Sequence, residues 1–160
     1  MLLLAAASGI GRALADHCVH EGMKVVLADV DQAALRQTEQ SLKNSGAKVL
    51  AVRKFEDVES LAQRTLDVFG AVHLLFNNAG VDARATLWEA TLADWHWAIV
   101  NLWGVIHGVR TFVPIMLRQR DDCRVVNTSS IAGLISGPGI GTPASHPVSR
   151  SHPPLQGDTL

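Results

Sequence analysis

The order of apolar and polar positions along the chain predicts strands that alternate with helices. Short apolar runs rich in β-branched residues are typical of strands, and apolar residues spaced at i, i+3 and i+4 are typical of helices. Strands are predicted at residues 2–4, 24–29, 48–53, 72–77 and 123–129. The first predicted helix has Ile10, Ala13, Leu14 and Cys18 on one face, and further helices are predicted at residues 31–44, 57–69 and 91–118.

The composition of these strands predicts the fold class. Runs such as "VVLA" and "LLF" are apolar at consecutive positions, and strands of this kind are covered on both faces of a parallel sheet. Gly22, Gly46 and Gly70 each lie between a helix and the next strand, where a left-handed cap favours glycine. With right-handed crossovers, the pattern predicts an α/β fold: a doubly wound parallel sheet of about five strands.

Length and composition narrow the class of protein. The chain has 160 residues, of which 48% are hydrophobic and 18% are charged, as expected of one globular domain. A formal net charge of -1 provides no basic surface for nucleic acid. No uninterrupted apolar run approaches the ~20 residues of a membrane span, so a protein without a membrane segment is expected.

The cysteines and histidines indicate a reducing compartment and no metal. Cys18 and Cys123 lack C-x-x-C spacing, so buried free thiols are expected in a cytoplasmic protein. His146 and His152 lack a third ligand at metal-binding spacing, so no metal site is expected. The first residues, "MLLLAAAS", have no basic start and are interpreted as a strand and turn rather than a signal peptide.

Candidate chemistry begins where the first two strands end, because doubly wound sheets bind ligands at the carboxyl ends of their strands. Gly9 and Gly11 in "ASGIGRALA" would let the backbone approach a phosphate at a helix start. A tight turn made for packing is the alternative. Asp29 ends the second strand, where a carboxylate accepts ribose hydroxyls and repels a 2′-phosphate. This favours NAD over NADP, and a solvated strand-end aspartate is the alternative.

Two further motifs, "NNAG" at residues 77–80 and "NTSSIAG" at residues 127–133, follow the fourth and fifth strands. Together with "ASGIGRALA", "LADVD" and "VNLWGVIHGV", they resemble the short-chain dehydrogenase/reductase family over residues 1–142. The resemblance implies a Rossmann-like fold and an oxidoreductase that moves hydride between a nicotinamide cofactor and a secondary alcohol or ketone.

The resemblance also implies roles for individual residues. The implied cofactor-binding residues are Ser8, Gly9, Ile10, Gly11, Asp29, Asn78, Ala79 and Gly80. Asn101 would hold a water in a proton relay, and Ser130 would orient the substrate oxygen. A polar position in an apolar helix and a strand-end serine that caps the backbone are the alternatives. Hydride transfer to a carbonyl also needs a proton donor, and a serine hydroxyl is too weak an acid for that role.

The chain departs from the family at the expected acid. It contains no tyrosine, and Pro143 and Pro147 stand where the family carries Tyr-x-x-x-Lys. Residues 1–142 are therefore interpreted as a partial nucleotide-binding domain, and residues 143–160 as an irregular, disordered tail. A frameshift, alternative splicing or an incomplete gene model near residue 142 would explain why the family pattern stops there.

Three functions stay open on the sequence alone. The first is an NAD-dependent oxidoreductase. This chain by itself is expected to be inactive. The second is a catalytically dead nucleotide-binding or interaction subunit, which would pair with copies or relatives through the helix near residues 91–118. The third is a non-functional fragment. The substrate is not identified by any motif.

Overall fold

The computed structural model describes residues 2–4, 6–52, 58–81 and 89–130. Its nine elements follow in chain order: β1 (Leu2–Leu4), α1 (Gly9–His20), β2 (Val25–Ala28), α2 (Gln32–Asn44), β3 (Val49–Val52), α3 (Val58–Phe69), β4 (Leu74–Asn77), α4 (Leu92–Gln119) and β5 (Arg124–Asn127). Each predicted strand and helix is present, with ends shifted by at most two residues. The predicted tail, residues 143–160, lies outside the described residues.

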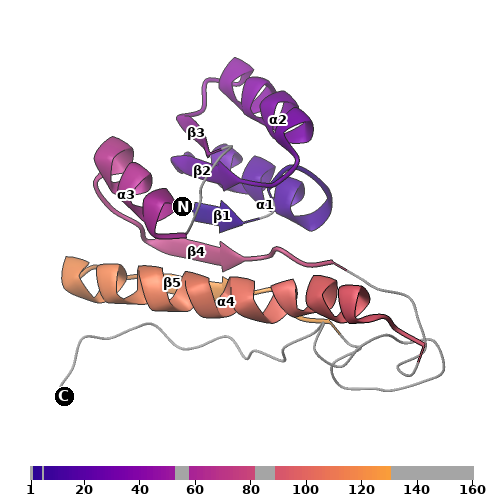
Figure 1. The fold of residues 1–160 in the computed structure, drawn as a ribbon. Helices are drawn as coiled ribbons and strands as arrows, with labels where there is room; N and C mark the ends of the chain where they lie inside the picture. The colour runs from indigo at the N-terminus through magenta and orange to yellow at the C-terminus, as the bar shows by residue number, and fades with distance from the viewer. Residues whose placement is uncertain (1, 5, 53–57, 82–88, 131–160) are drawn as a thin grey trace.

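The five strands form one parallel sheet in the order β3-β2-β1-β4-β5. Leu4 pairs with Ala28 on one side and with Asn77 on the other, and Asn77 pairs with Asn127. The carboxyl ends of β1, β2, β4 and β5 therefore meet at one edge of the sheet (Figure 1). The strand order reverses between β1 and β4, which is where doubly wound sheets bind their ligands. The α/β, Rossmann-like prediction is confirmed.

Helices cover both faces of the sheet. In β2, Val25 and Leu27 belong to a core cluster that contains Ala15 of α1 and Leu35 of α2. Their neighbours in β2 belong to a second cluster on the opposite face, with α3 and α4. This division follows from the alternation of side chains along a strand. It explains why the strands carry no polar alternation in the sequence.

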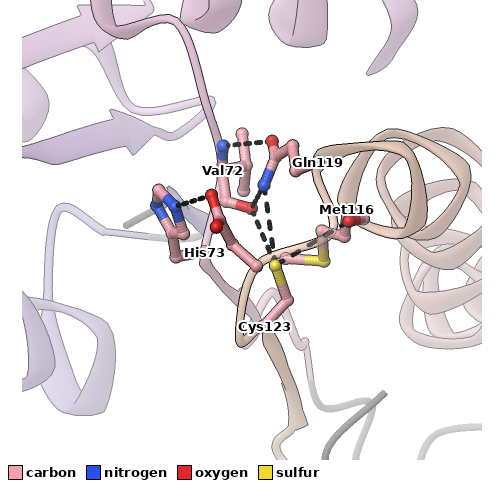
Figure 2. A network of polar contacts seen from close by, with 6 residues as sticks. Val72, His73, Met116, Gln119 and Cys123 are labelled. Atoms are coloured by element: carbon pink, nitrogen blue, oxygen red, sulfur yellow. Dashed lines mark hydrogen bonds and ion pairs between the residues drawn. The ribbon is translucent and has the colours of Figure 1, made fainter. Parts of the chain in front are cut away.

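The side chain of Gln119, at the end of α4, hydrogen-bonds the backbone just before β4 in the way that a neighbouring strand would (Figure 2). The Gln119 carboxamide oxygen accepts the Val72 N–H at 2.8 Å, and its nitrogen donates to the Val72 carbonyl at 2.9 Å. Cys123 lies beside them, with its Sγ 3.6 Å from the same carbonyl. Arg120 ends the helix in the left-handed region at φ 56°, and the chain turns there into β5. This network fixes α4 against the sheet.

The outer face of α4 is apolar and exposed. Trp97, Val100 and Trp103 are each about half exposed, with 47–55% of their surface accessible. Within the described residues, α4 is the one helix long and apolar enough to cross a membrane by length and composition, with a mean hydropathy of 1.3 in its most apolar window. The sequence expectation of no membrane segment counted apolar runs, and it stays a prediction because α4 meets the criterion by length and composition only. Core helices of soluble proteins meet the same criterion.

Candidate nucleotide-binding site

The glycine turn between β1 and α1 has a backbone that requires glycine. Gly9 has φ +51°, in the left-handed region, although a Cβ built there would meet nothing within 4 Å. The conformation rather than the space therefore selects glycine. Ser8 precedes it as an extended N-cap residue, and its side chain makes no capping hydrogen bond.

The start of α1 differs from the starts of α2 and α4 in how its N–H groups are satisfied. In α2, the Asp31 carboxylate accepts the N–H groups of Ala33 and Ala34. In α4, Thr91 and Asp94 form a reciprocal capping box. The first turn of α1 contains no acidic residue, and the side chain of its N-cap residue, Ser8, makes no capping hydrogen bond. The N–H groups and positive dipole end of α1 are suited to an anionic group, and phosphate binding there stays a prediction.

The carboxylate of Asp29 lies against this turn. Its Oδ2 accepts the Ala7 N–H at 2.9 Å, and its Oδ1 accepts the Asp31 N–H at 3.0 Å. Two residues that are distant in the sequence, the end of β2 and the entry to α1, are thus joined directly. Because the backbone donors orient the carboxylate, its remaining lone pairs lie beside the glycine turn. This geometry fits the adenosine half of a dinucleotide.

Sequence reasoning missed a second set of contacts to the same turn. The Thr38 hydroxyl of α2 donates to the Ala7 carbonyl at 3.3 Å, and Arg12 Nη1 donates to Thr38 Oγ1 at 3.1 Å. Thr38 is 1% exposed and lies between Leu35 and Leu42 on the buried face of α2. The available signal was a lone polar residue within an apolar stripe of helical period.

The ends of β4 and β5 are joined through the asparagines of the NNAG and NTSS motifs. Asn77 Nδ2 donates to Asn127 Oδ1 at 2.7 Å, and the Asn77 carbonyl accepts the Thr128 N–H at 3.0 Å. The Thr128 hydroxyl donates to Asn78 Oδ1 at 2.8 Å. These contacts hold the strand ends together immediately before Ser130, which is half-buried.

Asn101 is buried in α4 and holds the segment that follows NNAG. Its Oδ1 accepts the Val81 N–H at 2.7 Å, and its Nδ2 donates to the Val81 carbonyl at 2.8 Å. A Cβ at Gly80 would lie 3.8 Å from the same Oδ1. The side chain therefore orders the carboxyl edge of the sheet. Its predicted role in a proton relay stays a prediction, as does the role of Ser130.

A doubly wound parallel sheet with a glycine turn and an acidic residue at the end of β2 defines a dinucleotide-binding class of α/β domain. The family model described as "short chain dehydrogenase" matches residues 1–143, and the chain belongs to this family. The resemblance inferred from the motifs is confirmed. In the part of the chain that the structure describes, no cluster of three metal-ligating side chains occurs.

Similar proteins support the same family. The chain is 34% identical over 145 residues to the CLA biosynthesis dehydrogenase/reductase of Lactiplantibacillus plantarum, covering 88% of this chain and 51% of that protein. A short chain dehydrogenase/reductase of Burkholderia phymatum, solved in complex with NAD, is 49% identical with a TM-score of 0.86, over 89% of this chain and 53% of the other. A short chain oxidoreductase of Pseudomonas aeruginosa, solved with NADPH bound, is 26% identical with a TM-score of 0.77, over 91% and 56%. The chain spans about half the length of the curated relatives it matches.

Proposed function

We propose that this chain binds a nicotinamide dinucleotide and prefers NAD to NADP. The observation that carries the proposal is the Asp29 carboxylate, whose Oδ2 accepts the Ala7 N–H at 2.9 Å beside the glycine turn. A carboxylate there accepts hydroxyls of the adenosine ribose and repels a 2′-phosphate. The Burkholderia relative bound to NAD and the Pseudomonas relative bound to NADPH both support a nicotinamide cofactor, and Asp29 supports the choice between them.

The residues proposed to hold the cofactor lie along the carboxyl edge of the sheet. The glycine turn would hold the pyrophosphate and the NNAG turn would lie beside the nicotinamide; the residues are Ser8, Gly9, Ile10, Gly11, Asn78, Ala79 and Gly80. When bound, the cofactor supplies a centre that accepts or donates hydride. Ser130 would orient the oxygen of a secondary alcohol or ketone, and Asn101 would hold a relay water through the segment it orders.

We further propose that this chain alone does not turn over substrate. Its sequence contains no tyrosine, and a serine hydroxyl such as that of Ser130 is too weak an acid to supply the proton that hydride transfer to a carbonyl requires. Residues 1–142 would then act as a partial dinucleotide-binding domain, with residues 143–160 as a separate tail. NAD reduction by the purified chain with a secondary alcohol would contradict this.

A second candidate function is an interaction subunit without catalysis. The exposed apolar face of α4, with Trp97, Val100 and Trp103, favours it, because large exposed apolar side chains on one helix face are typical of association surfaces. A second copy or an intact relative would cover this face. Sedimentation velocity over a range of protein concentrations tests it, and a monomer throughout would argue against self-association.

Thermal unfolding of the purified chain with and without millimolar NAD tests the binding proposal. A ligand that binds only the folded state at 100 times its Kd adds about 2.7 kcal/mol to the free energy of unfolding. We expect a higher midpoint with NAD and a smaller increase with NADP. A cooperative transition that neither ligand moves would contradict nucleotide binding, and equal shifts would contradict the preference for NAD.

A further inference from the structure

We propose that Thr38 of α2 is a positioning residue of the phosphate-binding turn, and that its hydroxyl sets the affinity of the turn for a pyrophosphate group. The inference rests on the proposed dinucleotide binding and extends it to a residue outside the motifs. The starting observation is that both backbone polar groups of Ala7 are held by side chains: Asp29 accepts its N–H at 2.9 Å, and Thr38 donates to its carbonyl at 3.3 Å.

Ala7 lies at the entry to the glycine turn, so these contacts affect how the turn is held. Ala7 lies one residue before the N-cap Ser8 and two before Gly9, whose φ of +51° defines the turn. The two peptide groups that flank Ala7 are therefore each fixed, the first by Asp29 at the end of β2 and the second by Thr38 of α2. A turn fixed at its entry presents the following N–H groups in one arrangement, so less conformational entropy is lost when an anion binds.

The burial and the chemistry of Thr38 both indicate that its hydroxyl positions the glycine turn. The residue is 1% exposed on the stripe of α2 that also buries Leu35 and Leu42. Valine has nearly the same shape and would pack there without a polar atom to satisfy. A buried hydroxyl is unfavourable unless it is hydrogen-bonded, so its presence needs the bonds it makes.

Arg12 orients the proton of the Thr38 hydroxyl. Its Nη1 donates to Thr38 Oγ1 at 3.1 Å, so that oxygen is an acceptor from the guanidinium and its single proton points to the Ala7 carbonyl. The guanidinium is itself fixed, because Nη2 donates to Ser41 Oγ at 3.0 Å and Nε donates to Asp16 at 2.9 Å. The chain of donors runs from Arg12 through Thr38 to Ala7, and such chains strengthen each member.

Replacement of Thr38 by valine and by serine, with a matched control on α3, tests the inference. Thr65 is also a buried helical threonine, 2% exposed, and its hydroxyl donates to the Leu61 carbonyl of its own helix, so Thr65→Val is the same change away from the turn. Affinities for NAD, ADP and adenosine are measured by calorimetry on the full chain. Because adenosine lacks phosphate, it reports the ribose contact of Asp29 without the turn.

We expect T38V to weaken NAD and ADP binding about fivefold to tenfold, the effect expected from losing the hydrogen bond that holds the Ala7 carbonyl. Adenosine binding should change less than twofold, T38S should restore most of the affinity, and T65V should leave it unchanged. If T38V lacks a cooperative unfolding transition, Thr38→Cys replaces it, since a thiol is a weak donor of similar size.

The other outcomes distinguish failure of the positioning role from failure of nucleotide binding. Wild-type affinity for NAD and ADP in T38V, or an equal loss for adenosine and ADP, would overturn the positioning role and leave nucleotide binding intact. Failure of the wild-type chain to bind any of the three ligands would overturn the proposed function and this inference with it.

Discussion

The side-chain oxygen of Asn77 occupies the place where Gly108 would carry a side chain. A Cβ built on Gly108 of α4 would lie closer to Asn77 Oδ1 than real Cβ atoms come to any other atom. Asn77 is 3% exposed, and its Oδ1 has no hydrogen-bond partner among the described residues. Its Nδ2 donates to Asn127 at 2.7 Å. The absence of a side chain at Gly108 therefore lets α4 pack against the strand ends that precede the candidate site.

Gly108→Ala is expected to destabilise the fold. The new methyl group would displace the Asn77 carboxamide and break its bond to Asn127, and overpacking of this kind costs about 1–3 kcal/mol. Gly104 of the same helix is the control, because a Cβ there meets nothing within 4 Å and alanine favours a helix by about 0.5–1 kcal/mol over glycine. Urea unfolding measures both variants.

A second measurement separates this contact from a general effect of alanine in α4. Asn77→Ala removes the obstructing oxygen, so G108A should destabilise an N77A background less than it destabilises the wild-type chain. Additive effects of the two changes would contradict direct contact, since residues in contact couple by about 0.5–3 kcal/mol.

Asp29→Asn is expected to reduce the preference for NAD while leaving the turn in place. The asparagine oxygen can still accept the Ala7 N–H, which Asp29 Oδ2 accepts at 2.9 Å. The amide nitrogen cannot accept the Asp31 N–H, which Oδ1 accepts at 3.0 Å, and the negative charge that repels a 2′-phosphate is lost. The ratio of the NADP and NAD dissociation constants should change about tenfold toward NADP, which corresponds to about 1.4 kcal/mol. Asp122→Asn, at the exposed turn before β5, is the charge-matched control. An unchanged ratio would show that Asp29 does not contact the ribose.

The sequence predicted the elements of this fold well because the apolar periodicity of each segment is local. General rules for doubly wound sheets placed the glycine turn and Asp29 at the carboxyl ends of their strands, whereas the strand order and the bond from Ala7 to Asp29 came from the structure. The positions of Thr38 and Gly108 could not be predicted in this way. Each depends on a contact between segments more than thirty residues apart, Thr38 with Ala7 and Gly108 with Asn77, and no local pattern records such a contact.

The start of β4 is another feature that the sequence alone did not predict. The apolar run predicts a strand from residue 72, whereas the strand begins at Leu74. The N–H and carbonyl of Val72 are bonded to the Gln119 carboxamide at 2.8 and 2.9 Å. A side chain from the end of α4 thus takes the place of a neighbouring strand, and a glutamine in a helix gives no sign of this in the sequence.

The capping box of α4 predicts a loss of stability in acid. Hydrogen bonds from Thr91 hold the pKa of Asp94 below its ordinary value, so the unfolded chain binds this proton more readily than the folded chain. The contribution of Asp94 is therefore present above its ordinary pKa near 4 and is lost as the pH falls through the lower folded value. Thermal midpoints of wild type and Asp94→Asn should differ at pH 7 and converge as the pH falls below 4. A constant difference would contradict this origin.

The two cysteines predict how the folded chain responds to thiol reagents. Burial raises the pKa of both Cys18 and Cys123, and the first lies in the α1–α2 core cluster whereas the second lies in the α3–α4 cluster. Since the thiolate is the reactive form, both should be alkylated slowly at pH 7.5 and rapidly in urea. Cys18 is on the helix that begins at the glycine turn, so NAD should slow its alkylation further by stabilising the folded state. Mass spectrometry resolves the two sites. Rapid labelling of Cys18 without denaturant would mean that α1 is not held against the sheet, and then the turn could not be preorganised.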